Sequence, residues 1–146
     1  MNLSVQPVAG FEMFAAERGR GVSLNNKSVS VSETGSLQDA LLVTGFPYDI
    51  AKRDNFSAHF SEMLLASRAV RRDGSAAIDL AYVASGRFDG FWEEGLNPWD
   101  IAAGVLMIRE AGGQATYYDG TALDIYKPPV CASNGKIHDE MLNILG

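Results

Sequence analysis

The stretch Phe91–Gly113 reads FWEEGLNPWDIAAGVLMIREAGG, and the predicted fold is organised around it. We expect the end of a strand, a short loop, and then a helix with both of its ends marked. Asn97 suits the N-cap of that helix and Pro98 its first position, while Asp100 falls in the first turn. Gly112 ends the helix, because glycine accepts the left-handed conformation that closes one.

Two acidic side chains flank the predicted loop. Glu93 ends the strand and Asp100 begins the helix, which is where α/β folds usually place ligands. Their carboxylates suit a hard cation such as Mg²⁺, or one cation and one substrate hydroxyl, but further ligands have to complete a metal site. Spacing alone favours a simpler role for Asp100, which is to cap the helix. For Glu93, the spacing is equally consistent with a solvated acid in the loop.

A second turn, Gly74-Ser75-Ala76, leads from a predicted strand into a predicted helix. Its free backbone N–H groups can bind an anion or a hydroxyl. The alternative is a plain turn in which the Ser75 side chain caps the helix, and the turn on its own favours that alternative. We therefore keep the turn as a candidate that needs support from neighbouring segments.

Three other acids can be weighed as ligands. Asp79 falls inside the predicted helix, where we expect it at the surface or hydrogen-bonded in the core. Asp89 is expected to form an ion pair with Arg71 or Arg72 if their strands are neighbours. Asp119 lies in a predicted Asp-Gly turn between two strands. None of the three is a strong ligand candidate.

Composition narrows the class of protein. The chain has 146 residues, 47% of them hydrophobic, and 18 acidic against 12 basic residues give a net charge of −6, which argues against nucleic acid as the main partner. Its single cysteine, Cys131, forbids an internal disulfide and fits a reducing compartment. The two histidines, His59 and His138, lie far apart, which argues against a zinc site. No apolar run is long enough to cross a membrane and no signal peptide is evident, so we expect a cytoplasmic protein without membrane partners.

The order of the predicted elements indicates an α/β fold. Short strands come first, separated by Gly- or Asn-containing turns, at residues 3–6, 11–15, 22–24 and 29–31. Strands then alternate with helices, the strands at residues 40–44, 69–72, 87–93, 116–118 and 130–132 and the remaining helices at 53–66, 75–85 and 137–145. We predict a mixed, largely parallel sheet with helices on both faces, formed by residues 35–146. Residues 1–34 are predicted to be a remnant of an antiparallel sheet, in which Phe11, Met13 and Phe14 lack packing partners.

Several ordered motifs resemble the inositol monophosphatase family, bacterial branch. Trp99–Gly104 (WDIAAG), followed by Glu110–Gly113 (EAGG), is similar to the second signature of that family. The segments before it also match, namely Ala15–Asn25, Thr44–Asp49, Arg71–Ala77 and Gly86–Glu93. The resemblance covers essentially the whole chain.

The resemblance implies a Mg²⁺-dependent phosphomonoesterase, in which a metal-activated water attacks phosphorus in line. It makes Asp100 a metal ligand and Glu93 an acceptor for a sugar or inositol hydroxyl. It also makes the backbone of Gly74, Ser75 and Ala76 a contact for the same ring. A weaker implication is that Arg71 and Asp89 form a structural pair near the site. The resemblance also places Trp99 beside the metal ligand.

One expected motif is missing. The first signature of the family, Asp-Pro-Ile/Leu-Asp-Gly-Thr, supplies two metal aspartates and a phosphate-binding turn, yet no Asp-Pro occurs in these 146 residues. Asp119-Gly120-Thr121 lacks that dipeptide and lies after the second signature. The resemblance therefore implies the C-terminal half of such an enzyme, which we expect to bind Mg²⁺ weakly and to be inactive alone.

Other functions stay open at this stage. A fructose-1,6-bisphosphatase or another sugar-phosphate phosphatase of the same family is an alternative. A split enzyme, completed by a separate N-terminal half that docks against residues 1–32, is another. A third is a non-catalytic binding or assembly module that forms homo-oligomers through an open sheet edge.

Overall fold

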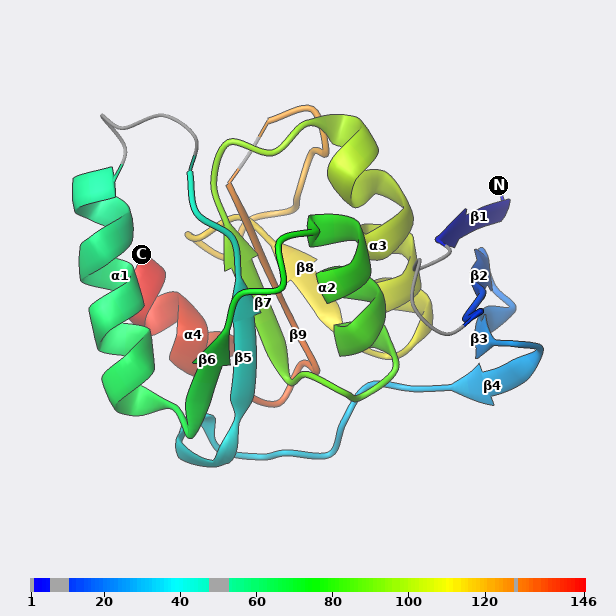
Figure 1. Cartoon of the computed structure of the whole chain (residues 1–146), viewed down its shortest axis with the longest axis horizontal. Coiled ribbons are helices and arrows are strands. Elements are labelled where there is room, and N and C mark those ends of the chain that lie inside the picture. Colours follow the sequence, from blue (N-terminus) through cyan, green and yellow to red (C-terminus); the bar gives the residue numbers. More distant parts are fainter. Residues whose placement is uncertain (1, 6–10, 48–52, 128) are drawn as a thin grey trace.

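The computed structural model describes residues 2–5, 11–47, 53–127 and 129–146. Within these ranges it contains two β-sheets and four α-helices, arranged in layers (Figure 1). Tyr48 and Asp49, which belong to one of the matching motifs, and Gln6 of the first predicted strand lie outside the described residues.

The first sheet is antiparallel, and we refer to it as the small sheet. Its order is β1-β2-β3-β4, with bounds Asn2–Val5, Phe14–Glu17, Gly21–Leu24 and Lys27–Val29. Asn25 and Asn26 form the turn between β3 and β4 with φ of 49° and 65°, as a two-residue hairpin turn requires. The predicted strand at 11–15 is wrong in its start, because Phe11 has φ 55° and is 91% exposed. The predicted strand at 29–31 is also shifted, because the Val31 N–H bonds to the Ala111 carbonyl instead of a strand.

The second sheet is mixed, and its order is β6-β5-β7-β9-β8. The strands are β5 (Leu41–Thr44), β6 (Ala69–Arg71), β7 (Gly90–Glu93), β8 (Gln114–Thr116) and β9 (Val130–Ser133). β5 pairs in parallel with both β6 and β7, whereas β9 pairs antiparallel with β7 and β8. The predicted mixed sheet is thus confirmed, and β5, β6 and β7 end at the same edge.

Two predicted strands have different bounds in the structure. The strand predicted at 87–93 begins only at Gly90, because Arg87 and Phe88 donate backbone hydrogen bonds to the Tyr82 carbonyl and extend the end of a helix. The strand predicted at 116–118 ends at Thr116, because residues 117–120 form a turn in which the Gly120 N–H bonds to the Tyr117 carbonyl.

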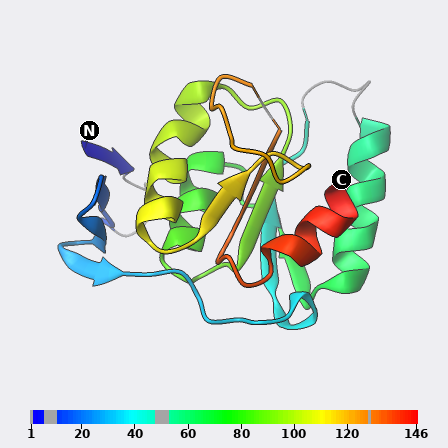
Figure 2. The same ribbon diagram turned by 180° about the vertical axis from the view of Figure 1, so that it is seen from behind.

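Helices cover both faces of the mixed sheet (Figures 1 and 2). On one face lie α1 (Arg53–Ala66) and α4 (His138–Leu145), which pack on Leu42, Trp92 and Cys131. On the other lie α2 (Ala76–Ala84) and α3 (Pro98–Glu110), which pack on Val43, Phe91 and Val130. The small sheet packs outside α3. The alternation of side chains along β7 therefore sends Trp92 to the α1–α4 side and Glu93 to the α2–α3 side.

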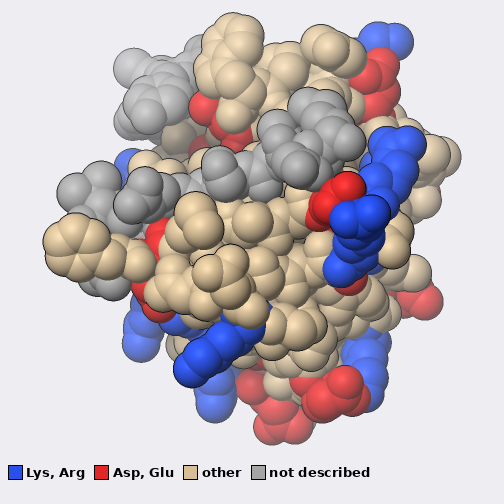
Figure 3. All heavy atoms as spheres, turned by 90° about the vertical axis from the view of Figure 1, so that its right-hand side faces the viewer, with Lys and Arg blue, Asp and Glu red and all other residues tan. Residues whose placement is uncertain are grey.

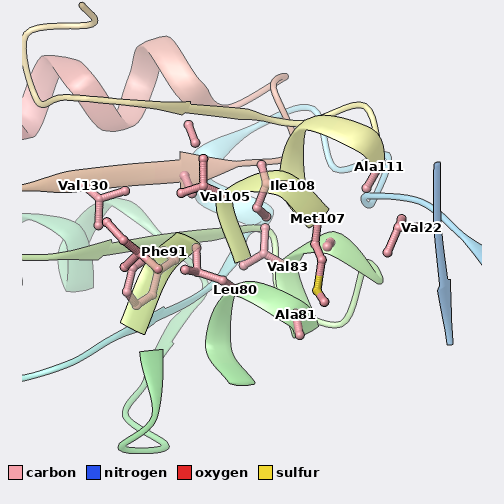
Figure 4. Packing of buried hydrophobic residues seen from close by; sticks show 14 of the residues in the cluster. Val22, Leu80, Ala81, Val83, Phe91, Val105, Met107, Ile108, Ala111 and Val130 are labelled. Atoms are coloured by element: carbon pink, nitrogen blue, oxygen red, sulfur yellow. The ribbon is translucent and has the colours of Figure 1, made fainter. Parts of the chain in front are cut away.

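The largest core cluster joins α2, α3 and both sheets (Figure 4). Phe14 of the small sheet is fully buried in it and meets the ring of Tyr82 edge-on, with centroids 6.1 Å apart. The expectation that Phe14 lacks a partner is therefore wrong, whereas Phe11 is exposed. Because residues from both sides of the proposed boundary share this core, the division between residues 34 and 35 stays a prediction. Among the described residues, no helix is long and apolar enough to cross a membrane.

Candidate functional site

A pocket of about 380 Å³ lies at the edge where the three parallel strands end. Its walls come from the segments that follow β5, β6 and β7 and from the first turns of α2 and α3. The carboxyl ends of parallel strands are the usual ligand position in open α/β sheets, and helix N-termini add free N–H groups. The lining residues are Gly45, Phe46, Arg72, Gly74, Ser75, Ala76, Ala77, Glu93, Leu96, Asn97 and Asp100.

Glu93 is the deepest charged group of the pocket wall. It is the last residue of β7, its side chain is 7% exposed, and a β-carbon placed on Gly45 would lie 2.2 Å from its carboxyl group. Burial raises the pKa of Glu93 to about 7, and the charge of Asp100 adds to the rise, while Arg72 opposes it. The carboxyl group can therefore both accept and donate hydrogen bonds near neutral pH.

Asp100 is the third residue of α3 and caps the start of that helix. Its Oδ2 accepts the backbone N–H of Asn97 at 2.9 Å, and α3 starts at Pro98 as expected. The structure thus shows the helix-capping role expected of Asp100. It uses one carboxylate oxygen, so a second function for the other oxygen remains compatible with the cap. Asp100 and Glu93 line the same pocket, as the sequence predicts.

The Gly74–Ala76 turn also lines the pocket. Gly74 takes φ 90°, which a β-carbon would strain, and Ser75 occupies the N-cap position of α2 in an extended conformation. The Ser75 side chain makes no capping hydrogen bond, so the alternative of a plain turn capped by this side chain is wrong. The first N–H groups of α2 thus face a polar pocket without a side-chain cap from Ser75.

Asp79 lies nearer to the site than we expected. It is fully buried in the first turn of α2, and neither of its carboxylate oxygens has a hydrogen-bond partner among the described residues. Burial raises the pKa of Asp79 to about 7, helped by the charges of Asp73 and Glu93 and opposed by Arg72. The expectation of a surface or core-bonded side chain is therefore wrong, and Asp79 forms part of the electrostatic surroundings of Glu93.

Arg72 and Phe46 line the pocket, although the sequence did not single them out for it. The guanidinium carbon of Arg72 lies 5.0 Å from the centre of the Phe46 ring, which is the geometry of a cation–π contact. The only signal in the sequence is that each follows a strand whose end lies at the same edge. Sequence spacing cannot report that their side chains meet.

Arg71 and Asp89 do not form the expected pair. Asp89 precedes β7 at the far end from the pocket, where its carboxylate accepts the Ser32 hydroxyl at 2.5 Å and the Leu41 N–H at 2.6 Å. No ion pair joins Asp89 to Arg71 in the part of the chain that the structure describes. Asp89 instead ties the connection between the two sheets to β5.

Two further residues can be placed. Trp99 is 77% exposed at the start of α3, next to Asp100, and is not part of the pocket wall. The Asp119 carboxylate accepts hydrogen bonds from the backbone N–H and the hydroxyl of Thr121, at 2.9 and 2.6 Å. That arrangement closes a turn, in agreement with the interpretation that this Asp-Gly-Thr sequence is not a phosphate-binding signature.

The described residues do not form a complete metal site on their own. Residues 2–5, 11–47, 53–127 and 129–146 include no group of three or more His, Cys, Asp or Glu side chains placed to hold an ion. Asp100 fits as one carboxylate ligand of a hard cation, which requires about six oxygen ligands in all. The residues on this chain therefore fit a shared metal site better than a self-sufficient one.

Comparison with known proteins gives consistent matches over nearly the whole chain. A model of the inositol monophosphatase family matches residues 4–145. An inositol-1-monophosphatase of Synechocystis sp. is 49% identical over 135 residues, which are 92% of this chain and 47% of that protein. A Nus factor SuhB of Pseudomonas aeruginosa is 42% identical, over 92% of this chain and 51% of that protein.

The fold has close counterparts among solved structures. The structure of an inositol monophosphatase from Anabaena (Nostoc) sp. superposes with a TM-score of 0.93 at 44% identity, covering 97% of this chain and 57% of that one. A SuhB protein from Bartonella henselae superposes with a TM-score of 0.95 at 36% identity, covering 99% and 56%. The chain thus spans about half the length of the relatives it matches.

Proposed function

Because the chain belongs to the inositol monophosphatase family, we propose that it contributes half of a site for the Mg²⁺-dependent hydrolysis of a phosphomonoester. Inositol phosphate is the proposed substrate, since relatives that are 49% and 44% identical are named for it. One observation carries the proposal: Glu93, Asp100 and the Gly74–Ala76 turn converge on a single pocket.

In this proposal, Glu93 and the turn hold the ring of the substrate. A ring hydroxyl donates a hydrogen bond to the Glu93 carboxylate, while backbone N–H groups at the start of α2 donate to ring oxygens. Gly45 keeps the carboxylate in place, because only a residue without a β-carbon leaves room for it. Binding that is spread over two segments orients the ring relative to its phosphate, which favours reaction.

Asp100 supplies one carboxylate oxygen to Mg²⁺ and uses the other to cap α3. The cap fixes the side chain in one orientation, so little conformational entropy is lost when the ion binds. When bound, the ion neutralises charge on the phosphoryl group and lowers the pKa of a bound water. A single carboxylate does not hold Mg²⁺ tightly, so the remaining ligands have to come from residues other than those that line this pocket.

We therefore propose that the 146-residue chain is inactive alone and acts with a segment that carries the Asp-Pro-Ile/Leu-Asp-Gly-Thr signature. The outer face of the small sheet is the proposed contact for it. A shallow depression of about 370 Å³ lies there, lined mainly by small or polar residues of β2, β3 and β4 such as Ala15, Ser23 and Ser28. Figure 3 looks onto this side of the molecule, where uncharged residues, drawn in tan, cover much of the described surface between groups of Lys and Arg.

A non-catalytic assembly role is the second candidate. Phe11 is 91% exposed and Met13 43% exposed beside the small sheet, and exposed apolar side chains of this size favour association. Homo-oligomer formation through the small sheet would be visible by light scattering, and a monomer at all concentrations would count against it.

The experiment that tests the main proposal is reconstitution. The chain is co-expressed with the N-terminal half of the Synechocystis relative, and phosphate release from inositol monophosphate is measured with and without Mg²⁺. We expect Mg²⁺-dependent turnover by the pair and none by either half.

Asp100→Asn should lower kcat by about 100-fold or more, because charge stabilisation in the transition state depends on the ion. Glu93→Gln should mainly raise KM, because the hydroxyl loses a charged acceptor.

Two results would contradict the proposal. Phosphate release by the chain alone, at a rate typical of metalloenzymes, would show that its own residues suffice. Failure of a correctly assembled pair to hydrolyse any phosphomonoester would show that the pocket serves another purpose. Parallel assays with fructose 1,6-bisphosphate and other sugar phosphates decide among substrates of the same class.

A further inference from the structure

Three buried polar atoms on the α1–α4 side of the mixed sheet have no hydrogen-bond partner among the described residues. They are Nδ1 of His59 in α1, Nε1 of Trp92 in β7 and the hydroxyl oxygen of Tyr118, which follows β8. Trp92 is fully buried and Tyr118 is 9% exposed. Because buried polar atoms in folded proteins are nearly always bonded to protein or to ordered water, these atoms indicate a site for a small polar molecule.

The three side chains lie in one part of the core. The rings of His59 and Tyr118 meet edge-on, with centroids 5.8 Å apart and an interplanar angle of 85°. Trp92 and Tyr118 belong to the same cluster of buried residues. Along the sheet, Trp92 pairs with Cys131, which pairs in turn with Thr116, shortly before Tyr118. Helix α1 and the ends of β7 and β8 therefore bring their unpaired polar atoms to the same side of the sheet, near the same edge.

Glu94 borders these atoms from the segment after β7. Its Oε1 lies 3.8 Å from Nδ1 of His59, and both side chains are partly exposed. The separation is too long for a direct hydrogen bond but short enough for one water to bond to both atoms. Burial raises the pKa of the Tyr118 hydroxyl, and the charge of Glu94 raises it further, so the hydroxyl stays protonated and can donate. We refer to His59, Trp92, Glu94 and Tyr118 as the polar cluster.

We propose that one ordered water is bound at the centre of the polar cluster and anchors the segment after β7 to α1. The donors and acceptors of the cluster match those of a single water molecule, which can accept two hydrogen bonds and donate two. The Tyr118 hydroxyl and the Nε1–H of Trp92 donate to the water. The water donates to the Glu94 carboxylate and to Nδ1 of His59. Internal waters typically make about three such bonds, and a water bonded in this way is costly to remove.

The anchored segment forms part of the pocket wall. Glu94 directly follows Glu93, and the chain then runs through Asn97, which also lines the pocket, into α3. The Thr44 hydroxyl donates to the carbonyl just before Glu93 at 2.5 Å, whereas the water holds the chain just after it. His59 is thus a positioning residue for Glu93, which it reaches through the water and Glu94, and this role rests on the proposed function.

A crystal structure of the chain is the direct test of the water site. We expect an ordered water within about 3.2 Å of both the Tyr118 hydroxyl and Nδ1 of His59. A dry cluster, or a direct hydrogen bond between His59 and Glu94, would overturn the proposal.

Unfolding of Tyr118→Phe gives a result whose sign depends on the water. Removal of a buried hydroxyl without a partner stabilises a fold, whereas removal of one that is bonded to water destabilises it. We expect the equilibrium constant for folding to fall by about fivefold, as for the loss of an ordinary hydrogen bond, measured by urea denaturation at constant pH. Tyr126→Phe is the matched control, because Tyr126 is 73% exposed and the change should be small. Equal or greater stability of Tyr118→Phe relative to the parent would count against a bound water.

A double-mutant cycle tests whether His59 and Tyr118 share the water. His59→Phe removes the ring nitrogens and keeps a ring in contact with position 118. Once one substitution has released the water, the second has less to remove, so the loss in the double variant should be smaller than the sum of the single losses. Additive losses would show that the two side chains do not bind the same water.

The reconstituted enzyme tests the positioning role. His59→Phe should raise KM for inositol monophosphate about threefold and retain kcat, because Glu93 is less well placed for the substrate ring. His59→Asn should restore most of the affinity, since its amide keeps a polar atom near the position of Nδ1. An unchanged KM in His59→Phe would overturn the positioning role. If the reconstituted pair has no activity at all, the proposed function fails, whereas the crystal structure and the unfolding measurements still decide the water site.

Discussion

The backbone of Gly45 passes directly against the carboxyl group of Glu93. A β-carbon at position 45 would lie 2.2 Å from the carboxyl carbon and from both of its oxygens, which is closer than real contacts allow. The glycine after β5 therefore determines where the acid at the end of β7 can lie. Because the acid is the far end of a flexible side chain, an added methyl group would displace it without disturbing the fold.

We expect Gly45→Ala to move the Glu93 carboxyl group toward solvent. Burial is the main cause of its raised pKa, so the pKa should fall from about 7 toward the ordinary value of 4.5. A carbon-detected NMR titration of the Glu93 side chain measures this change, and the melting temperature should alter little. Gly35→Ala is the matched control, because nothing lies within 4 Å of a β-carbon there. An unchanged titration of Glu93 in Gly45→Ala would show that the carboxyl group is placed by other contacts.

Asp79 should make the stability of the chain depend on pH. Its pKa is about 7 in the folded state against an ordinary value of 3.8, so the folded state binds the proton more tightly than the unfolded state. The stabilisation is complete below about pH 3.8 and is lost as the pH rises to about 7 and above. Asp79→Asn removes the charge, and we expect it to stabilise the fold at pH 8 by on the order of 3 kcal/mol and to have little effect at pH 4.

Urea denaturation of both proteins at the two pH values checks this expectation. The reference is Asp73→Asn, which removes an exposed acid on the same side of the pocket. Asp73→Asn should raise the free energy of unfolding at pH 8 only slightly, because it removes the repulsion between Asp73 and Asp79. Equal stability of Asp79→Asn and the parent at pH 8 would mean that the buried carboxylate has found a partner such as an ordered water.

The strand–loop–helix unit could be predicted because its signals are local. Asn97, Pro98 and Gly112 mark the ends of α3, and the structure has the helix at Pro98–Glu110 with Gly112 at φ 90°. The convergence of Glu93 and Asp100 on one pocket also follows from their positions at a strand end and a helix start. Such features depend on backbone conformation and need little information from distant residues.

Features set by side-chain packing between distant segments were not predictable in the same way. Asp79 is buried because α2 packs both on the mixed sheet and against α3, so more than one face of α2 is covered. The contact of Arg72 with Phe46 depends on the order of β5 and β6 in the sheet. Asp89 was assigned to the wrong partner because the connection through Ser32 brings other donors to its carboxylate.

A chain of hydrogen bonds through His138 should make the fold sensitive to acid. The Gly135 N–H donates to the Ser133 hydroxyl, whose oxygen lies 2.9 Å from Nδ1 of His138, and Nε2 of the same ring lies 2.8 Å from the Thr116 hydroxyl oxygen. The Thr116 hydroxyl donates onward to the Tyr117 carbonyl. We therefore assign Nε2–H as the donor to Thr116 and Nδ1 as the acceptor from Ser133, an arrangement with a neutral imidazole ring.

Burial lowers the pKa of His138 below its ordinary value of 6.5, although Asp139 opposes the shift. The unfolded chain therefore takes up the proton first, and the stabilisation present above about pH 6.5 is lost progressively as the pH falls. We expect the advantage in melting temperature of the parent over His138→Gln to shrink between pH 7 and pH 5, because the opposite contribution of Asp79 is present in both proteins. His59→Gln removes the other histidine of the chain, and its difference from His138→Gln should shrink in the same way. The same pH dependence in all three proteins would assign the effect to carboxylates instead.

The contact between α2 and α3 gives a prediction about stability. A β-carbon on Gly104 of α3 would lie 2.4 Å from the Leu80 β-carbon and 2.6 Å from its Cδ1. A change of rotamer can move Cδ1 but not the β-carbon of Leu80, so Gly104→Ala has to push the two helices apart. Overpacking costs about 1–3 kcal/mol, whereas alanine regains about 1 kcal/mol of helix propensity. We expect a net loss of about 1–2 kcal/mol, measured by urea denaturation. A stabilised Gly104→Ala variant would mean that the helices can separate without cost.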